Sequence, residues 1–568
     1  MRPRLLRGEV LTLAALAVVA VALFVVPLVL LARVGLTDGD GFSLVPLAEA
    51  LDSRSVRRAL WNSIESASLS ALFATAIGTA MALLIGLTDV RAKGAVVFAL
   101  LLPMMIPPHV TAIAWIQALG PSSPVLRTAG LAPPPGSPNP LYSPGGVAAL
   151  LTLQHMPLVL LVVLAALRAL PREMAEAARL AGAGPARLLA RVILPLIGPS
   201  LVAAFALAFV SALGNFGIQA LLGIPARYTT LPVLIWQRLA SFGPSVLADV
   251  AVISVLLAGL ALAALAGQLI ATRLVRTPIP GPPQPPMRFR LGRARPLAEG
   301  ALGLWVAASL VLPLAALVGT ALVRTYGLPL NAETVTLDHF AEILLRQEVT
   351  ARAFLNSSLA AGLAAALLAS LSVALAYFLQ TGRRRMARGA ATGVAGLADM
   401  SYAIPGLVIS VAFILAFIRP LPVLGISLYN TLWIIVAAYL TAFFAIALKP
   451  VAAAYGAIDP ALDDAARVSG AGFFRRMRRI FGPIVAPAAA AGAILVFLTA
   501  YNEVTVSALL WSTGNETIGT TIFNYDDGGY TTLAAAMSTV TVAATVLLMA
   551  ALHVFGRRLP PGVVPWRV

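Results

Sequence analysis

Long apolar runs, each close to the length of a membrane span, follow one another along the 568-residue chain. About twenty apolar residues of helix cross the hydrocarbon core of a bilayer, so each run predicts a transmembrane helix. The first half contains six runs, at 10–33, 60–87, 95–119, 146–168, 197–222 and 247–272. The second half contains six more, at 300–323, 356–380, 393–418, 429–449, 484–511 and 531–555. We therefore expect an all-α polytopic membrane protein with about twelve spans in two sets of six.

The composition agrees with this pattern and excludes a soluble protein. Hydrophobic residues make up 60% of the chain, charged residues 11%, and the mean hydropathy is +0.91. Cysteine is absent, which excludes disulfides, thiol catalysis and cysteine-ligated metals. The first apolar run follows a basic start, and because it is long enough to span we interpret it as an uncleaved anchor.

The net charge of +17 comes mainly from arginine clusters that mark every second loop. They precede the first span, follow spans two, four and six, and recur at 383–388, 467–479 and 557–558. The positive-inside rule then predicts that both termini lie in the cytoplasm, together with the two loops described next. The basic charge thus indicates topology and contact with anionic membrane lipid rather than a nucleic-acid partner.

Two of these loops share one pattern, at 171–195 and 460–483. Each starts with a proline, continues through an acidic residue and two alanines, breaks at a glycine and ends on a proline thirteen residues later. In the first loop Met174, Ala177 and Ala178 recur at helical spacing, which predicts a short amphipathic helix that the glycine ends. A basic loop between two spans is ordinary, but two copies with matched spacing indicate a repeated functional element.

Other matches between the halves support an internal repeat. Asn215 and Asn502 are 287 positions apart, close to the 288 positions between Gly182 and Gly470. Further matches are Asn62-Ser63 with Asn356-Ser357, and Ile106-Pro107 with Ile404-Pro405 inside the third span of each half, where proline bends a helix. Six spans separate the copies, so we expect the halves to be parallel. The predicted domains are 1–276, a proline- and arginine-rich cytoplasmic linker at 277–299, and 300–568.

The loop pattern resembles the cytoplasmic coupling loop of the permeases of ABC importers. A glutamate with two alanines, a glycine, an aliphatic residue and a final Leu-Pro match it at Glu176, Ala177, Ala178, Gly182, Val192, Leu194 and Pro195. The second copy departs at Asp464 and Gly482 but fits at Ala465, Ala466, Gly470, Ile480 and Pro483. The resemblance implies two parallel six-helix permease repeats whose coupling loops dock on an ATPase.

The resemblance also implies partners. The chain contains no phosphate-binding loop ending in Gly-Lys-Ser/Thr, so we expect ATP and magnesium on two copies of a separate cytoplasmic ABC ATPase subunit, with no cofactor in this chain. A periplasmic binding protein would deliver the substrate. The protein is then a non-catalytic, multi-pass component of the bacterial inner membrane.

Few polar groups fall within the predicted spans, and they are candidates for a translocation path because an intramembrane charge is costly. The candidates are Asn502 and Glu503 in the second half, with Asn215, Phe216 and Gln219 as counterparts in the first. Ordinary interhelical hydrogen bonds are the alternative reading. We interpret His109 and His155 as making lone interhelical hydrogen bonds, and we expect no metal site.

The residues after the first coupling loop, Asn215-Phe216-Gly217 and Ala220-Leu221-Leu222-Gly223, look most like those of the ferric-iron permeases. Ferric iron is therefore the predicted substrate, with thiamine or a 2-aminoalkylphosphonate as alternatives. An ion-coupled secondary transporter would also have two six-span halves, but it would need ionisable groups at mid-membrane, and only Glu503 qualifies. A membrane-embedded enzyme would need a cluster of polar catalytic groups, which the sequence does not offer.

Overall fold

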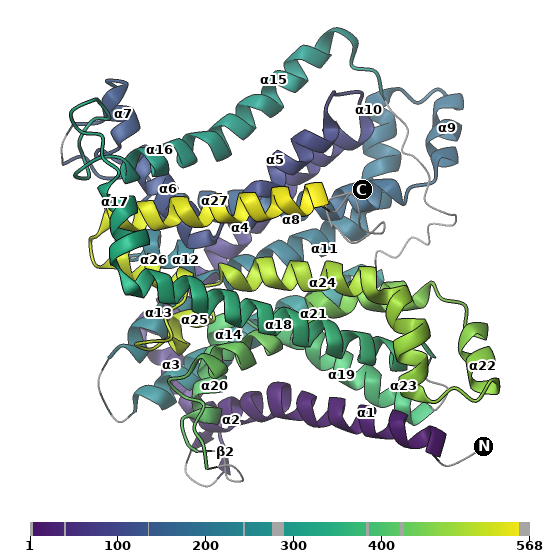
Figure 1. Cartoon of the computed structure of the whole chain (residues 1–568). Coiled ribbons are helices and arrows are strands. Elements are labelled where there is room, and N and C mark those ends of the chain that lie inside the picture. Colours follow the sequence, from purple (N-terminus) through teal and green to yellow (C-terminus); the bar gives the residue numbers. More distant parts are fainter. Residues whose placement is uncertain are drawn as a thin grey trace.

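The structure is a computed structural model, and it describes residues 4–38, 41–134, 136–241, 243, 245–274, 289–381, 385–420 and 425–555. Within these residues the fold is α-helical (Figure 1). One small antiparallel ribbon interrupts it, formed by β1 (Thr37–Asp38) and β2 (Gly41–Phe42). The expectation of an all-α membrane protein is confirmed.

The first half forms fourteen α-helices among the residues that the structure describes. They are α1 (Arg4–Ala20), α2 (Val26–Gly35), α3 (Val45–Asp52), α4 (Arg54–Leu87), α5 (Lys93–Met105), α6 (Pro108–Leu119), α7 (Pro124–Thr128), α8 (Pro144–Arg168), α9 (Arg172–Leu180), α10 (Pro185–Leu188), α11 (Leu194–Leu213), α12 (Phe216–Gly223), α13 (Leu231–Leu239) and α14 (Val246–Leu274).

The second half repeats this order from the short η3 (Gly292–Ala294) onward. Its helices are α15 (Arg295–Val306), α16 (Leu312–Ala321), α17 (Asp338–Ala341), α18 (Glu348–Thr381), α19 (Arg385–Ala403), α20 (Gly406–Phe417), α21 (Leu432–Gly456), α22 (Ala461–Val468), α23 (Phe473–Arg476), α24 (Gly482–Tyr501), α25 (Ser507–Leu510), α26 (Ile518–Asp527) and α27 (Thr531–Phe555). Long helix, broken pair, long helix, short loop helices and two further long helices thus occur twice.

Ten helices in the described residues are long and apolar enough to cross a membrane, or up to twelve if each of two bent pairs is one span. The bent pairs are α5 with α6, at 99°, and α19 with α20, at 114°. Both breaks fall at the predicted Ile-Pro dipeptides, since Pro107 and Pro405 are the residues that precede α6 and α20. The proline, which lacks an N–H, ends one helix and starts another instead of merely bending a continuous span.

Two predicted span ends were wrong. The runs at 197–222 and 484–511 were expected to be single spans, but α11 ends at Leu213 and α24 at Tyr501. The chain then turns back in short helices, because polar residues at these points cap new helix starts. The predicted linker at 277–299 lies partly outside the described residues, and its last part, from Arg295, belongs to α15.

Four π-helical turns occur just before prolines. These are η1 (Val21–Val25), η2 (Leu189–Ile193), η4 (Ala307–Val311) and η6 (Met477–Phe481). In each case a proline follows two positions after the turn, at Pro27, Pro195, Pro313 and Pro483. A proline ring clashes with the carbonyl four residues earlier, and a wider turn relieves that clash. In both predicted coupling patterns the wide turn therefore comes directly before the last two residues, which begin α11 and α24.

The first helices of each half cross to the other half. The α2 helix packs on α14 of its own half and on α20 of the second, and α16 packs on α27 and on α6 of the first. The halves consequently share one hydrophobic core. Figure 1 shows α9, α10, α22 and α23 at one end of the bundle and α7, α13, α17 and α26 at the other. We call these the coupling end and the opposite end; α1 begins and α27 ends toward the coupling end.

Candidate functional site

Two short helices, α9 and α22, stand apart from the bundle at the coupling end (Figure 1). The glycine that follows each has a left-handed backbone, with φ of +81° at Gly182 and +75° at Gly470. Such a φ strains any residue that carries a Cβ. No atom lies within 4 Å of where a Cβ would be at either glycine, so the backbone alone requires glycine there. The turn after both helices therefore has the same shape.

The predicted coupling residues of the first loop lie largely at the surface. Glu176 pairs with Arg172 at 2.7 Å, and both side chains are half-exposed. Ala177 is exposed, Ala178 is partly buried, and Leu180 is 90% exposed. An apolar side chain this exposed at a helix end is available to another protein. Leu194 and Pro195 instead form the first turn of α11.

The second loop is held more closely to the bundle. Asp464 is partly buried, Ala465 is exposed and Ala466 is buried, whereas Val468 at the end of α22 is 89% exposed. Ile480 lies in η6 and Pro483 in the first turn of α24. Contact of either loop with an ATPase remains a prediction.

A cavity of about 740 Å³ lies between the two halves. Its walls come from α5, α6, α11 and α14 of the first half and from α19, α20, α21 and α24 of the second. Both broken helices contribute their break, with Ile106-Pro107 on one side and Ile404-Pro405 on the other. The helix breaks therefore place loop backbone in the cavity wall, where non-helical backbone is tolerated in a membrane protein.

Two charged side chains in the cavity lining are exposed. Asp399 of α19 is 58% exposed and Lys449 of α21 is 66% exposed. Their charged groups lie 3.5 Å apart, and the Lys449 ammonium also lies 5.6 Å from the ring centre of Tyr402. The cavity thus presents one ammonium and one carboxylate side by side.

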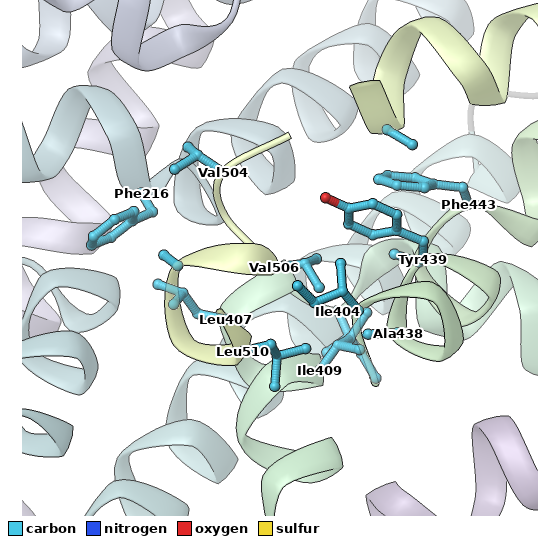
Figure 2. Packing of buried hydrophobic residues seen from close by; sticks show 14 of the residues in the cluster. Phe216, Ile404, Leu407, Ile409, Ala438, Tyr439, Phe443, Val504, Val506 and Leu510 are labelled. Carbon is cyan, nitrogen blue, oxygen red and sulfur yellow. The ribbon is translucent and has the colours of Figure 1, made fainter. Parts of the chain in front are cut away.

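Apolar side chains also line the cavity, among them Ile404, Phe443, Val504 and Val506. Figure 2 shows Val506 beside Ile404, with Val504 toward Phe216 and Phe443 beside Tyr439. Beyond them Phe523 of α26 packs against Phe216 and Trp236, with ring centres 5.3 and 5.7 Å apart. Phe523 belongs to the second half and its two partners to the first, so these three rings, which we call the aromatic seal, join the halves beyond the cavity lining.

Two of the five predicted path residues line the cavity, Asn502 and Glu503. The Asn502 amide donates to the Thr545 hydroxyl at 3.0 Å. The Glu503 carboxylate accepts the backbone N–H groups of Val506 and Ser507, at 2.6 and 3.1 Å, and so caps α25. Glu503 therefore has a structural role whether or not a substrate passes it.

The other three, Asn215, Phe216 and Gln219, lie in packed structure beyond the cavity lining. Asn215 caps α12 by accepting the N–H of Ile218 at 3.1 Å. Gln219 donates to the Ala212 carbonyl at 2.8 Å and accepts from Thr230. Phe216 belongs to the aromatic seal. These residues shape the turn after α11 and the seal.

The interpretation of two histidines needs correction. His155 bonds through Nδ1 to the Leu151 carbonyl of its own helix, at 2.7 Å, instead of to a neighbouring helix. His109 is fully buried and neither ring nitrogen has a partner among the described residues. A Cβ at Gly217 would lie 2.9 Å from the His109 backbone nitrogen, so α12 packs directly on α6 at this point. This approach requires a glycine.

The matched Asn-Ser pairs have a role that the sequence alone did not reveal. The hydroxyls of Ser63 and Ser357 accept the first backbone N–H groups of α13 and α26, from Leu231 at 2.8 Å and Ile518 at 2.9 Å. In the same way the amides of Asn62 and Asn356 donate to carbonyls just before those helices. In each half the Asn-Ser pair on the second span thus binds the chain segment that follows the fifth span. The presence of the same pair in both halves was the sequence signal of this role.

The chain is similar to known transport proteins. The family described as "Binding-protein-dependent transport system inner membrane component" matches residues 74–276 and 384–563, and each match contains one predicted coupling loop. A probable ABC transporter permease protein of Sinorhizobium fredii, y4fN, is 26% identical over 540 residues, which cover 91% of this chain and 90% of that protein.

Two further relatives match part of the chain. A probable molybdenum ABC transporter permease protein of Haloferax volcanii is 30% identical over 197 residues, covering 35% of this chain and 70% of that protein. PhnV of Salmonella paratyphi A, named as a 2-aminoethylphosphonate transport system permease protein, is 27% identical over 158 residues, covering 28% of this chain and 58% of PhnV. With two family matches, ten to twelve candidate spans and a cavity between its halves, the chain belongs to the binding-protein-dependent transport system inner membrane components, the permeases of ABC transporters.

Proposed function

We propose that this chain is a fused permease that forms the whole translocation path of an ATP-driven importer. Two separate ATPase subunits bind α9 and α22, and a binding protein docks at the opposite end. The observation that carries the proposal is the pair of exposed helices, each followed by a glycine in the left-handed conformation, in a chain whose two halves enclose a cavity. In this arrangement the coupling end and both termini face the cytoplasm.

The proposed mechanism is alternating access. In the structure the aromatic seal joins the halves, so the substrate would enter from the opposite end only after the seal parts. A ligand can drive such a change only through contacts that differ between the two states. Movement of α9 and α22 toward each other when the ATPase subunits close supplies that difference.

The substrate we propose is a 2-aminoalkylphosphonate. Its ammonium and phosphonate groups match the adjacent carboxylate of Asp399 and ammonium of Lys449, and PhnV is named for transport of such a compound. Ferric iron, predicted from the sequence after the first coupling loop, is the rival, and carboxylate oxygens of Asp399 and Glu503 would suit it better than Lys449. Competition between the two in an uptake assay separates these candidates.

The coupling role is tested by Gly182→Ala. At a φ of +81° an alanine costs about 1–2 kcal/mol. Either α9 takes another orientation that relieves the strain, or the folded loop becomes less stable by that amount. We expect ATP-dependent uptake to fall by about 5- to 30-fold, the equivalent of that energy, with normal membrane insertion.

The matched control is Gly184→Ala, because Gly184 has a φ of −69° and open space around it. It should transport normally. Equal uptake by both variants would refute the assignment of α9 as a coupling helix.

A further inference from the structure

Five polar side chains from three distant parts of the chain meet beside the second coupling helix. They are Glu9 of α1, Tyr377 of α18, Asp463 and Arg467 of α22, and Arg476 of α23. We call them the Glu9 cluster. Residues 9 and 476 stand at opposite ends of the sequence, so the cluster joins the first helix of the first half to the coupling loop of the second.

The contacts are short and form a closed ring. Arg476 binds Asp463 through one guanidinium nitrogen and Glu9 through the other, both at 2.5 Å. Arg467 likewise binds Asp463 at 2.7 Å and Glu9 at 3.0 Å. The Tyr377 hydroxyl accepts from Arg467 at 2.9 Å and donates to Glu9 at 3.3 Å. Removal of any one charged member leaves the others without a full set of partners.

The cluster is electrically neutral and largely buried: Arg476 is 2% and Asp463 4% exposed, whereas Glu9 is 17% and Arg467 18% exposed. Two carboxylates balance two guanidinium groups. Buried charges of this kind are stable only while they remain paired, so they move together or separate at considerable cost. The cluster therefore holds α1, α22 and α23 as one unit.

A second observation supports the close attachment of α1. Gly8 lies against α23, where a Cβ would be 3.3 Å from Phe473 and 3.2 Å from the Phe474 ring. The absence of a side chain lets α1 approach the coupling loop. Beyond it, α2 packs on α14 and on α20, both of which line the cavity. A continuous path of packed helix thus runs from α22 through α1 and α2 to the cavity walls.

The first coupling loop is attached differently. The positions that correspond to Asp463 and Arg476, 288 residues earlier, are Ala175 and Leu188, and the apolar Phe289 packs beside Ala175. The helix that corresponds to α1 is α15. Its Arg295 lies 3.9 Å from Asp89 in the turn between α4 and α5, and its Glu299 pairs with Arg295. At the second loop, by contrast, Arg467 of the coupling helix α22 forms an ion pair with Glu9 of the first half.

We propose that Glu9 makes the N-terminal helix part of the second coupling site. As a positioning residue it binds α22 and α23 to α1, so that a displacement of α22 by its ATPase partner also moves α1 and α2. The second coupling loop would then act on α1 through charged contacts, whereas the contact described at the first loop is the apolar one with Phe289. This inference rests on the proposed importer function.

The test uses the full chain, reconstituted with its ATPase subunits and binding protein, and compares Glu9→Gln with the matched control Glu299→Gln. Substitutions between two sites change their coupling by about 2- to 30-fold. We expect substrate taken up per ATP hydrolysed to fall within that range in Glu9→Gln, with ATP hydrolysis persisting and Glu9→Asp partly restoring the ratio. Glu299→Gln should keep the wild-type ratio.

A second measurement does not depend on transport. Because the chain lacks cysteine, spin labels can be placed through Leu11→Cys on α1 and Val468→Cys on α22, whose native side chains are 67% and 89% exposed. Glu9→Gln should broaden the distance distribution between them. A control pair on Leu297 and Leu180, 78% and 90% exposed, reports on the first loop and should not change.

The outcomes separate the two proposals. If the wild-type complex shows no ATP-dependent uptake, the importer function fails, and the label distances alone decide whether Glu9 holds α22. If the wild type transports and Glu9→Gln keeps both the uptake ratio and a narrow distance distribution, the role of Glu9 is overturned. If Glu9→Gln does not assemble, Tyr377→Phe replaces it, because this variant removes only the hydroxyl bonded to Glu9 and Arg467. The Tyr377→Phe variant must then show both the lower uptake per ATP hydrolysed and the broader distance distribution.

Discussion

The aromatic seal between the halves should control access to the cavity, and Phe523→Ala tests this directly. Phe523 is 4% exposed and contacts the rings of Phe216 and Trp236 in the other half. An aromatic pair contributes about 0.5–1.5 kcal/mol beyond its buried area, so two pairs contribute about 1–3 kcal/mol. These contacts exist only while the halves are together. Their loss should therefore raise the population that is open at the opposite end by about 5- to 150-fold.

The assay is chemical labelling of a single cysteine in the cavity. Thr505 lines the cavity, and since the chain has no native cysteine, Thr505→Cys gives a site without background. A membrane-impermeant thiol reagent is applied to the face that carries α26. The modification rate should rise with the open population in the Phe523→Ala variant.

Phe205→Ala is the control, because Phe205 stacks on Phe209 of its own helix and is 36% exposed. It removes the same side chain without breaking a contact between the halves. Equal modification rates in the two variants would refute the seal.

Two further predictions concern stability. Ser357→Ala removes the acceptor of the Ile518 N–H, so we expect the free energy of unfolding to fall by about 1–3 kcal/mol. The control is Ser370→Ala, whose hydroxyl bonds within its own helix, and it should change that free energy by no more than about 0.5 kcal/mol. Equal melting temperatures of the two variants in detergent would contradict the role of Ser357. Burial and the neighbouring Asp527 raise the pKa of Asp526 from 3.8 to about 6, so the folded protein keeps a proton that the unfolded chain loses. Stability should therefore fall as the pH rises through this interval, more in the wild type than in Asp526→Asn, and parallel melting curves against pH would contradict it.

Hydropathy and spacing predicted most of the fold because both arise from local physics. A run of apolar residues long enough to cross a bilayer becomes a helix whatever surrounds it. The requirement for glycine in each coupling loop is local as well, because it comes from the positive φ at that position and not from neighbouring atoms. The breaks at Ile106-Pro107 and Ile404-Pro405 were located, although their angles were not, because the angle depends on how the following helix packs.

Features that depend on distant contacts could not be predicted. The apolar run at 197–222 does not show that α11 ends at Leu213, where Asn215 caps the next helix; Ser63 of another helix holds the returning chain further on, at Leu231. Glu9 in the sequence is one acidic residue in a basic terminus. Its partners Arg467 and Arg476 lie more than 450 positions away. The aromatic seal could not be predicted either, because its rings come from both halves and meet only through the way in which the halves pack on each other.

The central claim is that this chain moves a substrate when separate ATPase subunits hydrolyse ATP. The most direct measurement is uptake of labelled 2-aminoethylphosphonate into vesicles that contain the chain, its co-purified ATPase and its binding protein, with and without ATP and with ferric iron as a competitor. We predict uptake that requires ATP and the binding protein and is insensitive to iron. Uptake that an ion gradient drives without ATP would contradict the account.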